Sequence, residues 1–181
     1  MGADRAEGQE FAARRDDVGE QRVSTVSAMA AVVTRCEAEL AAGGTLAALR
    51  YLNSRTRFRY TGVYHAEPPV LRNVDLFDRE NPHLNVAGGL NPLDETFCGI
   101  VCGTNAPFLT RDSLADARLS RHAARESVLS YGGAPIRLEN GEACGSLCHF
   151  DVRPRLLSAG EMRVLEHIAP LFARWFNEQG D

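Results

Sequence analysis

Cysteine is the residue type in this sequence most able to do chemistry, because a thiolate can act as a nucleophile or bind a metal ion. The chain of 181 residues has five cysteines, an odd number. They are Cys36, Cys98, Cys102, Cys144 and Cys148. The N-terminus, MGADRAEGQE, contains no apolar signal segment. An odd cysteine count without such a segment indicates free thiols in a reducing cytoplasm.

Two cysteine pairs have the spacing C-x₃-C, which raises the question of a zinc site. On a helix, residues four apart lie about 5–6 Å from each other, so Cys98 and Cys102 could share an ion. On a strand the same spacing is about 13 Å, so Cys144 and Cys148 could not. Structural zinc needs four ligands in a closed tetrahedron. We therefore predict no metal site, and thiols that pack as small hydrophobic side chains.

Arginine supplies all 20 basic residues, and the sequence contains no lysine. Schiff-base, P-loop and lysine general-base chemistry are thereby excluded. The net charge of -4 argues against nucleic acid as a partner, since phosphate contacts need a basic surface. No apolar run is long enough for a membrane helix.

Arg118, Arg121, His122 and Arg125 lie three, four and seven residues apart, which predicts one face of a helix over 115–126. Guanidinium groups match carboxylate and phosphate geometry, so this face could hold an anionic small molecule. The alternative is a solvated face whose arginines pair with acidic neighbours.

Aromatic side chains could wall a pocket for such a molecule, or fill the core instead. Asp94 and Glu95 are better explained as the cap of a helix than as catalytic carboxylates. We predict no catalytic residue and no cofactor. The candidate ligand-binding residues are Tyr60, Phe97, Cys98, Arg118, His122, Arg125 and Tyr131.

The elements that must position these residues follow from hydrophobic periodicity. Residues 1–22 are highly charged and predict a flexible tail that can become helical near its end, so the domain would be 23–181. The predicted helices are 23–42, 45–52, 95–105, 115–126 and one that starts after Ser158. The predicted strands are 58–64, 70–78, 108–110, 128–138 and 142–151, with a long loop over 79–93. This order predicts an α+β domain, an antiparallel β-sheet with helices on both faces.

The first and last helices carry apolar stripes. Ser158 and Glu161 form a capping-box pattern before the last helix. Two apolar stripes on one small domain suggest a homodimer through both helices, although both could pack on their own sheet. The candidate dimer residues are Met29, Val33, Leu165, Phe172, Trp175 and Phe176.

Two segments resemble the GAF domain family. The first is LDETFC at 93–98, followed by PFL at 107–109. The second is SYGGAPIR at 130–137, followed by Asn140-Gly141 and GSLCHFD at 145–151. The resemblance spans about residues 30–178 and implies a cytoplasmic sensor that binds a small molecule. It also implies that the signal leaves through association with a protein partner, without catalysis.

Two alternative functions remain open, a thiol-based reductase and a dimerisation module. Some GAF-like proteins are free methionine sulfoxide reductases, and Cys98 matches one of their cysteines. Their nucleophilic cysteine should fall within 119–127, which has none, so we expect no turnover of that substrate. Cys148-His149 is similar to the dipeptide that attaches bilins, but it falls in the last strand rather than on a pocket helix. The remaining reading is a dimerisation module with an empty pocket.

Overall fold

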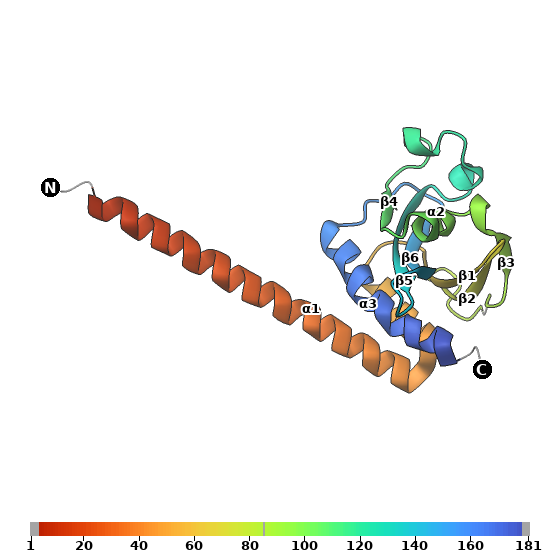
Figure 1. Cartoon of the computed structure of the whole chain (residues 1–181), viewed down its shortest axis with the longest axis horizontal. Coiled ribbons are helices and arrows are strands. Elements are labelled where there is room, and N and C mark those ends of the chain that lie inside the picture. Colours follow the sequence, from red (N-terminus) through yellow and green to blue (C-terminus); the bar gives the residue numbers. More distant parts are fainter. Residues whose placement is uncertain (1–3, 85, 179–181) are drawn as a thin grey trace. The chain divides into compact units, whose positions relative to one another are not determined.

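The computed structural model describes the backbone of residues 4–84 and 86–178. Side chains are described for residues 26–84, 86–174 and 176. The chain divides into a first unit, Met1–Arg35, and a second unit, Cys36–Asp181 (Figure 1). The second unit holds the sheet and the residues predicted to bind a ligand.

A single sheet of six antiparallel strands forms the centre of the second unit, in the order β3-β2-β1-β6-β5-β4. The strands are β1 Tyr60–Glu67, β2 Val70–Asp78, β3 Leu90–Pro92, β4 Phe108–Thr110, β5 Ser130–Arg137 and β6 Ala143–Asp151. The predicted antiparallel sheet is confirmed. β3 was predicted as loop, because three exposed residues are too short to show an alternating pattern.

Three α-helices accompany the sheet, namely α1 Asp4–Ser54, α2 Phe97–Thr104 and α3 Ala159–Glu178. Gly44, with φ of 69°, breaks α1 where the sequence predicted an end. Residues 4–22 are helical, in keeping with a composition rich in good helix formers. The flexible tail at 1–22 and the domain boundary at residue 23 stay predictions.

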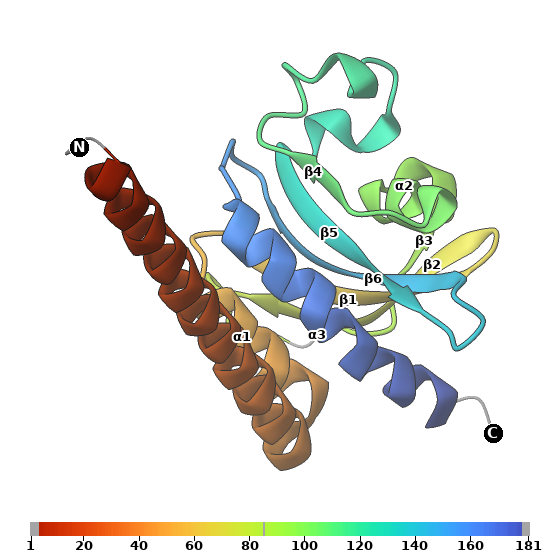
Figure 2. The same cartoon turned by 60° about the vertical axis from the view of Figure 1, so that its left-hand side comes forward.

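Helices cover both faces of the sheet in the second unit, as predicted. α3 packs on β5 and β6 from one side, and α2 packs on the same two strands from the other (Figure 2). Side chains alternate along β6, so Ser146 and Cys148 point toward α2 while Leu147 and His149 point away from it. The two faces of β6 therefore belong to two different layers, one packed against α2 and the other against α3.

The predicted helix caps are partly right. Glu161 donates its backbone N–H to the Ser158 hydroxyl at 3.1 Å, which confirms the cap of α3. The Glu161 carboxylate does not complete the capping box and pairs with Arg55 at 3.1 Å. α2 is capped by Thr96, whose hydroxyl accepts the N–H of Gly99 at 3.0 Å, and not by Asp94. A short 3₁₀ turn at Leu93–Glu95 takes up the residues before Thr96.

The predicted helix over 115–126 is wrong. The segment forms two 3₁₀ turns, η2 at Ala117–Leu119 and η3 at Ala123–Glu126. The side chains of Asp116 and His122 accept the N–H groups two residues on, and each thereby begins a new turn. Without a continuous helix, the arginines do not share one helical face.

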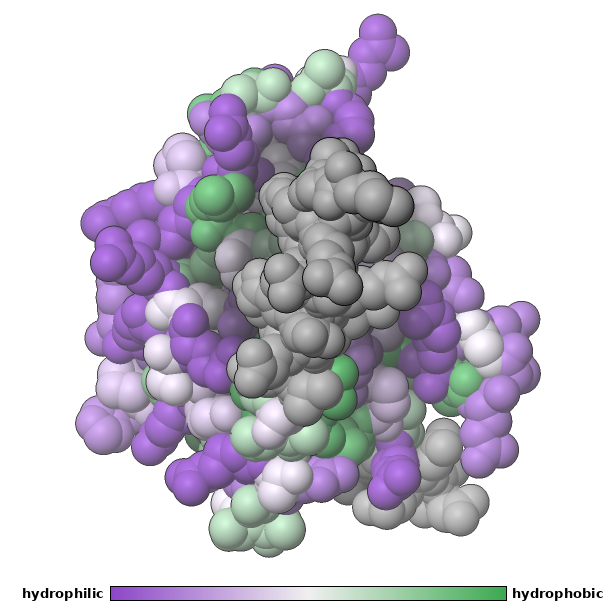
Figure 3. All heavy atoms as spheres, turned by 90° about the vertical axis from the view of Figure 1, so that its left-hand side faces the viewer, coloured by the Kyte–Doolittle hydropathy of each residue, from purple (hydrophilic) through white to green (hydrophobic). Residues whose placement is uncertain are grey.

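The apolar stripe of α3 packs within its own chain. Leu165 and Phe172 are fully buried and Phe176 is 8% exposed, which leaves these side chains no surface for a partner. The Trp175 side chain lies outside the described residues. Met29 and Val33 are half-buried in the first unit, and the homodimer stays a prediction. On the face drawn in Figure 3, hydrophobic side chains of the described residues occur in small areas among hydrophilic ones.

Candidate functional site

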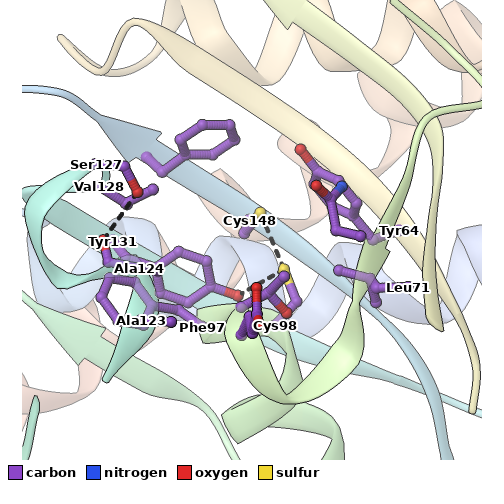
Figure 4. A pocket seen from close by; sticks show the side chains of 14 residues that line it. Tyr64, Leu71, Phe97, Cys98, Ala123, Ala124, Ser127, Val128, Tyr131 and Cys148 are labelled. Atoms are coloured by element: carbon purple, nitrogen blue, oxygen red, sulfur yellow. Dashed lines mark hydrogen bonds between the residues drawn. The ribbon is translucent and has the colours of Figure 1, made fainter. Parts of the chain in front are cut away.

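A cavity of about 300 Å³ lies between α2, η3 and the face of the sheet that α2 covers. Fourteen side chains line it, and they are drawn as sticks in Figure 4. Those that matter most for its chemistry are Tyr64, Glu95, Phe97, Cys98, Tyr131, Cys148 and Phe150. Four aromatic side chains and two thiols therefore form part of the wall.

The aromatic part of the wall is held by ring-to-ring packing. Phe97 meets Tyr131 edge-on with 5.6 Å between centroids, and Phe108 lies 6.0 Å from Phe97. Phe97 and Tyr131 are each no more than 3% exposed. Such edge-to-face packing restricts ring rotation, so the cavity has a defined shape.

A thiol and hydroxyl cluster lies at one side of the cavity (Figure 4). The Cys98 Sγ of α2 lies 3.9 Å from the Cys148 Sγ of β6. The Tyr131 hydroxyl donates to Cys98 Sγ at 3.3 Å and lies 3.0 Å from Ser146 Oγ. All four side chains are buried. α2 and the hairpin of β5 and β6 therefore meet at this cluster.

The cluster distinguishes its two thiols. Burial alone raises the pKa of Cys98, but hydrogen bonds from Cys148, Tyr131 and Ser146 outweigh it and lower the pKa below the ordinary thiol value. Burial raises the pKa of Cys148 well above that value, and its hydrogen bond to Cys98 adds to the effect. Cys98 is the thiol of this pair that more readily gives up its proton.

Two glycines make this arrangement possible. A Cβ on Gly133 would lie 2.2 Å from the Tyr131 hydroxyl oxygen, so glycine leaves room for that ring on the strand surface. A Cβ on Gly99 would lie 2.0 Å from the Leu93 carbonyl oxygen, at the turn that leads into α2. Both positions need the close approach that only glycine allows.

The structure brings three of the predicted ligand residues together, since Phe97, Cys98 and Tyr131 line the cavity. Tyr60 is not on the wall, and its ring stacks on Phe150 at 4.7 Å. His122 also lies outside the lining and packs against Phe97 at 4.8 Å. Burial lowers the pKa of His122, which favours its neutral form.

The two predicted arginines are held elsewhere. Arg118 pairs with Asp116 at 2.6 Å, lies over the Phe108 ring, and is not on the wall. Arg125 donates to the Leu114 carbonyl oxygen at 2.9 Å and is likewise absent from the wall. The acidic pairing that the sequence offered as an alternative is thus found at Arg118.

Sequence reasoning missed the role of Cys148 and Ser146. Both lie on one face of β6, two residues apart, which was visible as a period of two. The partner of Cys148 was sought along its own strand at Cys144, whereas it lies on α2. Only the packing of α2 on the sheet reveals the pair.

The other described features offer less chemistry. A second cavity of about 400 Å³ contains Arg55 and Arg155, which pair with Glu161 and Asp151. His149, on the far face of the sheet, has its pKa lowered to about 3 by burial and by nearby Arg55 and Arg79. Within the described residues, no three His, Cys, Asp or Glu side chains cluster as metal ligands.

The helices in the described part of the chain include none with the length and apolar character needed to span a membrane. No protein-family model and no curated protein matches the sequence.

Solved structures match the fold. The GAF domain of an Acinetobacter phosphoenolpyruvate-protein phosphotransferase is 13% identical with a TM-score of 0.63, covering 83% of this chain and 93% of its own. The type II free methionine-R-sulfoxide reductase of Thermoplasma acidophilum is 20% identical with a TM-score of 0.58, covering 74% and 89%. A far-red absorbing protein with bound biliverdin is 14% identical with a TM-score of 0.61, covering 81% and 98%. The fold, including the six-stranded antiparallel sheet, is that of a GAF domain.

Proposed function

We propose that this chain is a sensor module that binds a small molecule in the cavity between α2 and the sheet, without catalysing a reaction. The observation that best supports this proposal is the cavity itself, which has a volume of about 300 Å³ and packed aromatic rings in its wall. This volume is at the lower end of the range for ligand pockets, which suits a molecule of one or two rings. The biliverdin-bound neighbour supports the idea that this fold can accommodate an organic ligand.

The wall chemistry argues for an uncharged or cationic ligand rather than the anionic one that the arginine spacing suggested. Among the fourteen lining residues Glu95 is the one with a charged side chain, and it lies at the exposed rim. Aromatic faces attract cations and a carboxylate adds to that attraction. The Tyr131 hydroxyl supplies a polar group on the wall, and Ser146 bonds to it from outside the lining.

Native mass spectrometry of the freshly purified full chain tests the proposal. We expect a retained small molecule whose mass is lost on denaturation. Ala124→Phe should abolish retention because this half-buried side chain lines the cavity. Ala117→Phe is the matched control, since Ala117 is an exposed residue of the neighbouring turn and is absent from the wall.

Equal retention by the Ala124→Phe chain would place the ligand elsewhere and overturn the proposal. No retained mass, together with no binding of ring-containing amines to the wild-type chain, would favour a dimerisation module with an empty pocket.

A second candidate is a thiol reductase, because Cys98 and Cys148 both line the cavity and a solved neighbour is a free methionine-R-sulfoxide reductase. We favour the sensor because the segment 119–127 has no cysteine. We expect no turnover of free methionine sulfoxide with a dithiol reductant. Turnover that Cys98→Ser abolishes would replace the sensor with the reductase.

We also propose that the chain acts in a reducing cytoplasm, which its free cysteines support. We further propose that it signals by associating with a protein partner, which the GAF fold supports.

A further inference from the structure

Cys98 and Cys148 are 50 residues apart in the chain, yet their sulfur atoms lie 3.9 Å from each other. One is on α2 and the other on β6, and both are described as free thiols. A disulfide requires about 2.05 Å between sulfurs. Each sulfur would therefore need to move only about 1 Å, a shift that side-chain rotation can supply.

A route from solvent reaches this pair. Both cysteines line the 300 Å³ cavity, although each is almost completely buried from bulk water. Exposed residues Asn91, Glu95 and Ser127 line the same cavity and form its rim. A small oxidant can therefore reach the sulfurs through the cavity without unfolding the domain.

The surroundings favour one thiol as the attacking group. The Tyr131 hydroxyl donates to Cys98 Sγ, and Cys98 is the second residue of α2, near the positive end of that helix. These interactions favour the thiolate form of Cys98, in agreement with the lowered pKa of this thiol. By contrast, burial raises the pKa of Cys36 and of Cys102 to about 12. The remaining thiol, Cys144, donates to the Ile136 carbonyl oxygen.

We propose that Cys98 and Cys148 are a redox pair that hydrogen peroxide entering the cavity converts to a disulfide. The Cys98 thiolate attacks one peroxide oxygen, so that an S–O bond forms and the O–O bond breaks. The released hydroxide takes a proton and leaves as water. Cys148 then attacks the Cys98 sulfur, the S–S bond forms, the S–O bond breaks, and a second water leaves with the Cys148 proton.

The balance is two thiols and one hydrogen peroxide to one disulfide and two waters. The thiols lose two electrons and the peroxide gains them. A dithiol reductant reverses the change by thiol–disulfide exchange. The disulfide joins α2 to the sheet across one side of the cavity, so it alters the space available to any ligand.

Intact-mass measurement and peptide mapping of the full chain after exposure to hydrogen peroxide test this inference. We expect a mass lower by about 2 Da, a Cys98–Cys148 cross-linked peptide, and return to the original mass with a dithiol. Cys148→Ser should instead leave Cys98 as a sulfenic acid that dimedone traps. Cys102→Ser is the matched control on α2 and should form the disulfide as the wild type does.

The mapping of the wild-type chain decides the matter even where a variant fails to fold. Five free thiols after peroxide treatment, or a cross-link between any other two cysteines, would overturn the inference. The pair does not depend on the proposed sensor function, because the disulfide is measured without a ligand and ligand retention is measured without peroxide.

Discussion

Tyr131 is the single residue on which most of the site depends. Its ring packs against Phe97 and its hydroxyl touches both Cys98 and Ser146. The aromatic wall and the thiol cluster therefore share one side chain. Removing only the hydroxyl separates the two roles, since the ring can stay in place.

For Tyr131→Phe we expect the pKa of Cys98 to rise, because the thiolate loses a hydrogen-bond donor. The rate of Cys98 alkylation by iodoacetamide at neutral pH should fall several-fold, measured by peptide mass spectrometry in time. Tyr60→Phe serves as control, because Tyr60 stacks on Phe150 and is not a lining residue. An unchanged Cys98 rate would show that the hydroxyl does not support the thiolate.

His149 makes folding stability depend on pH. Its pKa is about 3 in the folded chain, where burial opposes the charged form, and about 6.5 when unfolded. Between these values the unfolded chain binds the extra proton, so stability is complete above about pH 6.5 and falls as the pH falls.

We expect this histidine to cost about 2 kcal/mol of stability between about pH 7.5 and about pH 5. Urea unfolding at both pH values checks this against His149→Gln, which keeps a polar partner for Thr61. The variant should lose less stability across the window than the wild type. Equal losses would mean that His149 accepts its proton in the folded state.

Strand β5 shows how a whole element is shaped for the site. It is buried from Ser130 to Ile136, and it lies between β4 and β6. Gly133 keeps the strand surface low on the side facing α2, so that Tyr131 can lie across it. The strand also contains Pro135, which lies opposite Ser146 of β6.

Gly133→Ala should push the Tyr131 hydroxyl away from Cys98, because the new Cβ would overlap it. We expect a loss of about 1–3 kcal/mol in stability from overpacking, and weaker retention of the cavity ligand. Gly103→Ala is the control, because a Cβ there meets nothing within 4 Å. Thermal unfolding measures the change in stability, and native mass spectrometry measures ligand retention. If Gly133→Ala behaves like Gly103→Ala in both, Gly133 is not needed to make room for Tyr131.

At the scale of the whole molecule, the α3 stripe belongs to the chain's own core. Leu165, Ile168 and Phe172 are fully buried there. The apolar stripe of the first unit differs, because Val26 is 70% exposed and Met29 and Val33 are only half-buried. These exposed fractions favour a homodimer that forms through the first helix rather than through α3.

Light scattering on the full chain at ~100 μM should therefore give roughly twice the chain mass of 19.8 kDa. Val33→Glu should shift the mass toward the monomer, since a charge would be buried in the contact. Ala31→Glu, at an exposed position on the opposite side of the helix, should leave it unchanged. A wild-type chain that stays monomeric at this concentration would remove the support for the dimer.

The sequence alone determined the features that depend on neighbouring residues. Period-two alternation predicted a strand over 58–64, and the turn after it led to the prediction of β2 with its observed ends. Ser158 and Gly44 predicted where α3 begins and α1 breaks. These signals are local, because a cap or a strand face needs only a few residues to be recognised.

The tertiary structure alone decided the site. Strand order places β6 beside β5 and lets α2 lie over both, and this brings Cys98 to Cys148 across 50 residues of sequence. At 115–126, shorter-range hydrogen bonds of Asp116, His122 and Ser113 overrode the helical pattern, whereas the Cys98–Cys148 contact joins distant elements. Contacts of this kind depend on the register and layering of distant elements, which periodicity along a single segment does not encode.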